Sequence, residues 1–384
     1  MSHSKTALFL LFHFAILFCH AQKKSTVDKS RPNVIYILAD DLGYGDLSCY
    51  GQEKFVTPNI DKLAKEGMLF TQHYSGAPVC APSRSALLTG LNTGHTYIRG
   101  NKEVEPEGQY PMPKGAFTLA EMLKSKGYAT GAFGKWGLGF PGSEGDPLHQ
   151  GFDSFYGYNC QKLAHHYYPH HLWNNENKVM LTQNEGANNG QYAPDLIHQK
   201  ALSFIETHKK ESFFLYYASP LPHAELVAPK VYMDKFIGKF NPENVYKAKP
   251  NTETLKKGEY ASQSQSHAAF VAMITLLDDQ VGEIVAKIKE LGLEENTIII
   301  FTSDNGPHKE GGADPDYFNS NGPLRGYKRD LYEGGIRVPM IAKWKGKIAQ
   351  GSKTNHISAF WDVMPTLATL TNAKIEGNID GISF

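Results

Sequence analysis

The stretch CAPSRSALLTG, from Cys80 to Gly90, places a cysteine beside residues that could make it reactive. Pro82 fixes φ for a first helical turn and Gly90 is a typical helix end, so the stretch predicts a short helix. We expect Cys80 to lie just before its N-terminus, where free backbone N–H groups and the helix dipole stabilise an anion. Arg84, about one turn further on, adds a positive charge. The pattern favours a reactive cysteine over a buried structural one.

Pairs of oxygen-bearing side chains follow two apolar runs. Asp40 and Asp41 come directly after VIYILA, and Asp304 and Asn305 come after TIIIFTS. Such runs are typical of strands that are buried on both faces. Carboxylates at the end of a buried strand need a cation or a basic partner, and hard oxygen ligands suit Ca²⁺ or Mg²⁺. Two buried strands could bring both pairs to one ion.

Two basic side chains stand on turns beyond predicted strands. Lys135, in GKWGLG, follows a strand predicted at 128–133, and its glycine-flanked turn leaves it free to reach an oxyanion. His223, in PLPH, follows a strand predicted at 213–217. A histidine on a proline-stiffened turn is well placed to donate a proton, because its ordinary pKa of about 6.5 lies near neutrality.

The segment 159–173 contains four histidines among aromatic residues. His165, His166, His170 and His171 could form a transition-metal tract. The interpretation we prefer is a loop that shapes a polar sugar pocket, with His165 and His166 as hydrogen-bond partners and aromatic rings as stacking faces. Irregular packing without a binding role is the third possibility.

Strands alternate with helices along most of the chain. Apolar residues at helical spacing predict helices at 118–126, 194–208 and 267–291. The alternation implies an α/β fold with a large, mainly parallel but mixed β-sheet sandwiched by helices. In such sheets ligands bind beyond the carboxyl ends of the strands, which is where the acidic and basic residues above are expected.

The composition limits the kinds of partner. The 384 residues include 39 Lys plus Arg and 39 Asp plus Glu, so the formal net charge is zero. A neutral chain argues against nucleic acid or an anionic membrane as a partner. An anion must therefore be recognised locally, by a few basic side chains. Cys49 and Cys160 could pair in an oxidising compartment, but we expect both to be free and buried.

The N-terminal residues differ from the rest of the chain. Residues 1–21 have an early lysine, an apolar run and a small-x-small ending, which are typical of a secretory signal peptide. The run is too short to span a membrane, so we expect no stable membrane insertion. A polar tether at 22–30 leads to one domain at 31–384, exported to the periplasm or the cell exterior. A lipoprotein anchor at Cys19 is less favoured, because Phe18 is bulky where a lipobox has a small residue.

At Cys80 to Gly90 the chain resembles the type I sulfatases of the alkaline phosphatase superfamily, whose signature is C-x-P-S-R-x-x-x-x-T-G. In that family a formylglycine-generating or anaerobic sulfatase-maturating enzyme oxidises the cysteine to Cα-formylglycine (3-oxoalanine), and the hydrated aldehyde is the nucleophile. The resemblance implies the same modification of Cys80. It extends over roughly 32–384 and includes NVIYILADDLG, SDNG and PLRGYKRDLYEGGIRVP.

The resemblance also implies roles for individual residues. It implies a Ca²⁺ site with the ligands Asp40, Asp41, modified Cys80, Asp304 and Asn305. It implies that Arg84, Lys135 and Lys328 neutralise charge on the sulfate and the nucleophile. His223 would protonate the leaving oxygen and, with the two lysines, contact the substrate.

The chain departs from the family pattern in two places. Many sulfatases have a histidine two residues after the lysine that matches Lys135, and this histidine is proposed to assist sulfate release. Here that position is Gly137. Family members also usually continue into a smaller C-terminal domain. We expect that domain to be missing here, through truncation or through a true difference.

The sequence thus predicts a sulfuric ester hydrolase, similar to arylsulfatases, that cleaves sulfate monoesters from a sulfated carbohydrate or, as the second choice, a small aryl sulfate. Its partners would be this substrate and the maturation enzyme, without nucleic acid. Two alternatives remain open. One is a phosphodiesterase or phosphonate monoesterase of the same superfamily, and the other is a catalytically silent protein that binds sulfated glycans.

Overall fold

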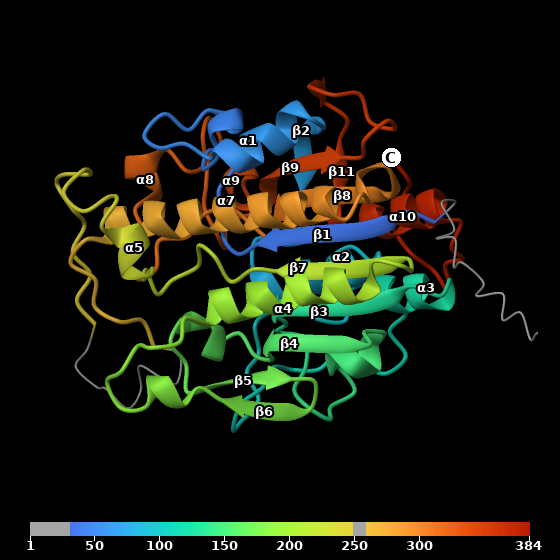
Figure 1. Ribbon diagram of the computed structural model, residues 1–384, viewed down its shortest axis with the longest axis horizontal. Coiled ribbons are helices and arrows are strands. Elements are labelled where there is room, and N and C mark those ends of the chain that lie inside the picture. Colours follow the sequence, from blue (N-terminus) through green and yellow to red (C-terminus); the bar gives the residue numbers. More distant parts are fainter. Residues whose placement is uncertain (1–30, 249–258) are drawn as a thin grey trace, which may run out of the picture.

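The computed structural model describes residues 31–248 and 259–384 (Figure 1). In this part of the chain one large sheet lies between two layers of helices, which confirms the predicted α/β fold. The predicted signal peptide, 1–21, and tether, 22–30, lie outside the described residues. Among the helices described, none is both long and apolar enough to cross a membrane.

Eleven strands of the described chain form the sheet. In chain order they are β1 (Asn33–Ala39), β2 (Met68–Tyr74), β3 (Ala129–Lys135), β4 (Ser154–Tyr158), β5 (His171–Asn174), β6 (Asn177–Met180), β7 (Phe213–Ala218), β8 (Thr297–Ser303), β9 (Arg337–Lys343), β10 (Ser352–Thr354) and β11 (Ser358–Ala359). Their spatial order is β10-β2-β9-β8-β1-β7-β3-β4-β5-β6, with β11 beside β2. The central strands from β8 to β4 are parallel, whereas β9, β5 and β6 join antiparallel. The sheet is therefore mixed, as predicted.

Helices cover both faces of this sheet. They are α1 (Pro58–Lys65), α2 (Cys80–Thr89), α3 (Leu119–Ser125), α4 (Ala193–His208), α5 (Lys230–Met233), α7 (Ser266–Glu290), α8 (Pro315–Phe318), α9 (Glu333–Ile336) and α10 (Val363–Thr371). Figure 1 shows α4 and α7 lying across one face. Ile35 and Ile37 of β1 pack in the same apolar cluster as these two helices, whereas Tyr36 and Leu38 pack with α2, α3 and α10. Because successive side chains of a strand point to opposite faces, the unbroken apolar run of β1 is buried on both sides.

The predicted helices are confirmed, with one difference at α2. The helices predicted at 118–126, 194–208 and 267–291 correspond to α3, α4 and α7. Cys80 was expected just before a helix but is the first residue of α2, after an extended Val79 with φ −156°. The first four N–H groups of a helix have no partner within the helix. Pro82, which lacks an N–H group, therefore removes no hydrogen bond at the third position of α2, and the helix can begin at Cys80. Cys80 still lies at the positive end of the helix dipole.

The three cysteines of the described chain are free. Cys160 is buried as predicted, but Cys49 is only half-buried. Burial raises the pKa of Cys160 to about 12 and is also the main reason why the pKa of Cys49 is raised. Neither is a reactive thiolate.

Asp278, in the middle of α7, has a structural role. Its carboxylate is buried and accepts hydrogen bonds from the backbone N–H groups of Ile60 at 2.8 Å and Asn59 at 3.1 Å. These N–H groups belong to the first turn of α1, where no partner exists within the helix. Thr57, the residue before α1, makes no side-chain cap to this helix. Asp278 therefore caps α1 from a second helix.

Replacing Asp278 should destabilise the fold. The change Asp278→Ala leaves the first turn of α1 without its acceptor and should lower the free energy of unfolding by about 2 kcal/mol, the upper end of the effect of losing a helix cap. Asp279→Ala is the matched control, because its carboxylate is half-buried and contacts only side chains. Urea unfolding of both variants checks this. Equal losses of stability would contradict the capping role.

Candidate active site

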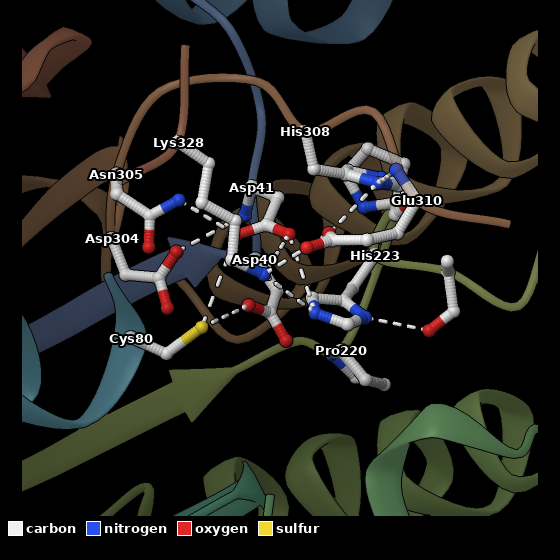
Figure 2. A network of polar contacts seen from close by, with 12 residues as sticks. Asp40, Asp41, Cys80, Pro220, His223, Asp304, Asn305, His308, Glu310 and Lys328 are labelled. Carbon is white, nitrogen blue, oxygen red and sulfur yellow. Dashed lines mark hydrogen bonds and ion pairs between the residues drawn. The ribbon is translucent and has the colours of Figure 1, made fainter. Parts of the chain in front are cut away.

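Neighbouring parallel strands end at one edge of the sheet, and the residues after them converge there (Figure 2). β1 is followed by Asp40 and Asp41, and β8 by Asp304 and Asn305. The last residue of β3 is Lys135, the loop after β7 provides His223, α2 provides Cys80 and Arg84, and the loop before α9 provides Lys328. Hydrogen bonds and ion pairs join these side chains in one network. The structure thus brings together all the residues for which the sequence predicted a metal-binding or catalytic role.

The oxygen-bearing side chains of the site are completely buried and contact one another. The Asp41 backbone N–H donates to Asp304 Oδ1 at 3.0 Å, and Asn305 Nδ2 donates to Asp41 Oδ1 at 2.6 Å. Asp41 has a φ of +62°, a value that residues other than glycine rarely adopt. Strain of this kind persists only where the surrounding contacts fix the backbone. The two strand ends therefore hold these oxygens in a defined arrangement.

Three buried cations pair with the three carboxylates. The pairs are Arg84–Asp304, Lys135–Asp40 and Lys328–Asp41, with N···O distances of 2.8, 2.6 and 2.7 Å. Arg84 binds Asp304 through both Nε and Nη2. Buried charges are tolerated when they are paired and hydrogen-bonded, and here three positive charges balance three negative charges.

Nearby cations offset the burial of Asp40 more than that of Asp304. Burial tends to raise the pKa of Asp40, but Lys135 and Arg84 outweigh it and hold that pKa below its usual value. For Asp304, burial and then the Asp40 charge raise the pKa above its usual value. Asp304 is therefore the least stabilised of the three carboxylates, and a further cation beside it would favour its charged form.

Cys80 lies inside this cluster and is buried. Its Sγ is 3.4 Å from Asp40 Oδ1 and 3.7 Å from Lys135 Nζ. Burial, followed by the charge of Asp304, raises the pKa of the thiol well above its ordinary value. For the unmodified thiol, burial and the nearby carboxylates thus outweigh the charge of Lys135. Stabilisation of an anion by the helix N-terminus stays a prediction for the modified residue.

His223 is the central ring of a histidine stack. Its ring centroid lies 4.9 Å from that of His165 and 5.4 Å from that of His308. Nδ1 faces the Ala224 carbonyl at 2.6 Å and must donate to it, which leaves Nε2 to accept from Lys328 Nζ at 2.9 Å. Burial and then the charge of Lys328 lower the pKa of His223 well below its ordinary value. In this arrangement the ring is neutral, so the predicted titration near neutrality does not describe His223 beside Lys328.

The histidines of segment 159–173 occupy different surroundings. His165 stacks on His223, whereas Nδ1 of the buried His166 lies 2.5 Å from Glu225 Oε1. His170 and His171 line a cavity of about 590 Å³. Of the potential metal-ligand groups in the described chain, none includes these four histidines. The segment thus contributes both to the edge of the site and to the wall of a cavity, and His165 and His166 keep their substrate-binding role only as a prediction.

Two residues in the site, His308 and Glu310, were not identified from the sequence. Glu310 Oε2 lies 3.4 Å from Lys328 Nζ, and Arg329 Nη1 donates to Glu310 Oε1. The Glu310 backbone N–H donates to His308 Nδ1 at 3.1 Å. Asp41, His308 and Glu310 have ligand atoms close enough to hold a metal ion. The available signal was the sequence PHKE directly after SDNG, where polar side chains continue beyond the end of a buried strand.

The residues at the strand ends fit a divalent cation. Asn305 Oδ1 is buried and has no hydrogen-bond partner in the described part of the chain. Ligand atoms of Asp40, Asp41, Cys80 and His223 all lie within 4.8 Å of one another. Carboxylate and amide oxygens are the ligands that hard cations prefer. This donor set suits Ca²⁺ or Mg²⁺ better than a thiolate-preferring metal.

Comparisons with known proteins identify relatives of this chain. The Sulfatase family model matches residues 32–373. The N-acetylgalactosamine-6-sulfatase of Rattus norvegicus is 34% identical over 380 residues, which cover 91% of this chain and 64% of the relative. The N-acetylgalactosamine-6-O-sulfatase of Bacteroides thetaiotaomicron is 31% identical, with coverage of 91% and 74%. The crystal structure of Ps i-CgsB in complex with k-i-k-neocarrahexaose is similar with a TM-score of 0.76 and 30% identity, covering 92% of this chain and 75% of that one.

Fold, site and comparisons together define an α/β protein of the alkaline phosphatase superfamily. Within that class, the chain belongs to the sulfatase family, which confirms the predicted resemblance. The chain spans 64% and 65% of the length of the rat and mouse relatives that it matches.

Loss of Arg84 should disrupt the cluster. Arg84→Met removes the buried guanidinium, leaves Asp304 and Asp40 without this partner, and should lower the free energy of unfolding by about 3–5 kcal/mol. The exposed Arg99, replaced by Met, is the control and should cost less than about 1 kcal/mol. Chemical unfolding measures both. Similar small losses for the two variants would show that the buried pairing does not stabilise the fold.

Proposed function

We propose that the protein hydrolyses sulfate monoesters and that its substrates are sulfated carbohydrates. The observation that carries this proposal is the set of three buried cations, Arg84, Lys135 and Lys328, gathered beside Cys80. Figure 2 shows Lys328 and Cys80 within the network. Cationic side chains held in place by buried carboxylates suit the oxygens of a sulfate group and the charge that develops on them during cleavage. The names of the relatives, which are sulfatases of amino sugars, support this reaction class.

We further propose that Cys80 is converted to formylglycine and that the resident ion is Ca²⁺, as the family resemblance implies. Asp40, Asp41, Asp304 and Asn305 would hold the ion through their side-chain oxygens, together with the modified residue. When present, the hydrated aldehyde supplies a hydroxyl nucleophile for sulfur and the ion supplies positive charge beside it. Because the six charged side chains balance one another, a divalent ion would leave an excess of positive charge that suits an anionic ester.

The other side chains of the site would bind the sulfate group, position the strand ends and donate a proton. Lys135 and Lys328 direct their Nζ atoms into the cluster from β3 and from the loop before α9, so both can hold sulfate oxygens. Arg84 is fixed by Asp304 and in turn orients the end of β3 by donating to the Lys135 carbonyl. His223 would provide the proton for the departing oxygen. A sulfate group beside His223 would offset the charge of Lys328. The pKa of His223 would therefore rise when the substrate binds.

The cavity near the site supports a carbohydrate as the substrate. It measures about 590 Å³, a size suited to a sugar unit, and is lined by polar residues that include Glu103, Glu107, Lys162 and His171. Carboxylates, imidazoles and ammonium groups all form hydrogen bonds with sugar hydroxyls. These groups pair as Lys162–Glu103 and His171–Glu107 and keep further hydrogen-bonding capacity. A small aryl sulfate would make little use of them, and is the less favoured substrate.

The other functions considered are less well supported. A phosphodiesterase or phosphonate monoesterase would use a similar cluster, but the rat and mouse relatives, at 34% and 33% identity, are sulfatases. A silent glycan-binding protein would not need Cys80 among buried cations and carboxylates. Export to the periplasm or the cell exterior remains a proposal that depends on residues 1–21, and cleavage of these residues in a secreting host would test it.

Conversion of Cys80 and turnover can be measured together. On co-expression with a formylglycine-generating enzyme, the Cys80 peptide should become roughly 18 Da lighter, the difference between cysteine and formylglycine. The converted protein should release sulfate from sulfated galactosamine or galactose units. Cys80→Ala should lower kcat/KM by at least about 1,000-fold because the nucleophile is lost. Peptide mass spectrometry and ion chromatography of released sulfate provide the readouts.

A matched control is Cys49→Ala, which removes another free thiol, one that does not line the cavity. It should leave both conversion and sulfate release within about two-fold of the parent. Full conversion without turnover of any sulfate ester would favour the silent binding protein. A Cys80 peptide that stays unmodified beside a maturation enzyme active on another sulfatase would contradict the proposed nucleophile.

A further inference from the structure

Tyr260 places an aromatic ring beside the proposed proton donor. Its ring centroid lies 6.2 Å from that of His223 and 5.2 Å from that of His165, and both pairs are tilted. The rings of His165 and His223 are themselves stacked and nearly parallel, with an angle of 7° between their planes. Tyr260 therefore flanks the stacked pair at an angle, and the three rings form one aromatic wall beside the site.

A buried carboxylate fixes the backbone next to Tyr260. The Ala261 N–H donates to Glu225 Oε2 at 3.0 Å. The other oxygen of this carboxylate, Oε1, lies 2.5 Å from His166 Nδ1. Glu225 is only 1% exposed, so its carboxylate depends on these partners. It therefore ties the residue after Tyr260 to the segment that carries His165, and the two rings are held together.

The hydroxyl group of Tyr260 is available to a ligand. Tyr260 is half-buried, and its Oη makes no hydrogen bond within the described part of the chain. Burial, followed by the charge of Glu310, raises the pKa of Tyr260 above its ordinary value, so the group keeps its proton and can donate. The charges of Lys328 and Asp41 also act on this hydroxyl group. Figure 2 shows these three charged residues around His223, and the hydroxyl group lies near them.

The leaving group of the substrate must lie close to the aromatic wall. His223 is the proposed donor to the departing oxygen, and a proton donor must come within about 2.6–3.2 Å of the oxygen that it protonates. The sugar carbon bonded to this oxygen is therefore held beside the His223 ring. In the described part of the chain, the ring contacts of Tyr260 are with His165 and His223. Tyr260 thus borders the position of the sugar rather than that of the sulfate group.

We propose that Tyr260 is a substrate-binding residue that recognises the sugar of the leaving group. Its ring packs against the C–H groups of one sugar face, and its Oη donates a hydrogen bond to a sugar hydroxyl. The inference rests on the proposed function, because it takes a sulfated carbohydrate as the ligand. A tyrosine side chain has an apolar body and a polar end, which match the mixed surface of a sugar ring. Tyr260 therefore contributes to affinity for the sugar and not to affinity for sulfate itself.

The test uses the full-length protein with Cys80 unconverted, saturated with Ca²⁺, and two probes, N-acetylgalactosamine 6-sulfate and inorganic sulfate. In calorimetric titrations, Tyr260→Ala should weaken binding of the sulfated sugar about tenfold or more, because the ring contact and the hydrogen bond are both lost. Its affinity for inorganic sulfate, which has no sugar, should stay within about two-fold of the parent. Tyr260→Phe keeps the ring and should weaken binding of the sulfated sugar by about threefold, through loss of the hydrogen bond alone.

Tyr232→Ala is the matched control. Tyr232 is also a half-buried tyrosine, but it belongs to α5 and its Oη donates to Asp279 Oδ2 at 2.9 Å. Its replacement should leave the affinities for both probes unchanged.

Two results would overturn the inference. One is an affinity of Tyr260→Ala for the sulfated sugar within two-fold of the parent, and the other is an equal loss of affinity for inorganic sulfate. A parent that does not bind the sulfated sugar would also contradict it. Because the titrations need neither formylglycine nor turnover, failure of this inference is distinct from failure of the proposed reaction, which the Cys80 experiment measures.

Discussion

The pairing of three buried cations with three buried carboxylates is the interaction on which this structure depends. No member of the cluster could be buried alone, because an unpaired charge costs several kcal/mol in the protein interior. Arg84 comes from α2, Lys135 from β3 and Lys328 from the loop between α8 and α9, so the pairs join distant parts of the chain. The site can therefore form only when the parallel centre of the sheet is correctly assembled.

The order of the strands in the sheet brings the paired charges together at one edge, where they form a binding site. The adjacent parallel strands β8, β1, β7 and β3 all end at one edge, and each delivers a polar side chain there. Beside this edge, the rings of His165, His223 and Tyr260 contact one another. The site thus has a charged centre, able to hold a cation and an oxyanion, and an aromatic wall beside it. This division agrees with an anionic group carried on a polar sugar.

Much of the fold and of the charged centre was predictable from the sequence. Long apolar runs indicate buried strands, and glycine or proline residues between them indicate turns. Asp40 and Asp304 could be placed together for the same reason. The raised pKa of Cys80 could not be predicted, since it depends on burial and on carboxylates distant in sequence. Nor could the contact between Gly137 and Gln161 be predicted, because these residues follow two different strands, β3 and β4.

The central claim is that the balanced cluster holds a divalent cation at the strand ends. A calcium titration of the full-length protein, with Cys80 unconverted, tests this claim most directly when the parent is compared with Asn305→Leu. Asn305 Oδ1 is the buried acceptor without a partner, so its loss should remove a ligand. The account predicts about one calcium ion per chain in the parent and at least tenfold weaker binding in the variant. No calcium binding by the parent, or equal affinity in the two proteins, would contradict it.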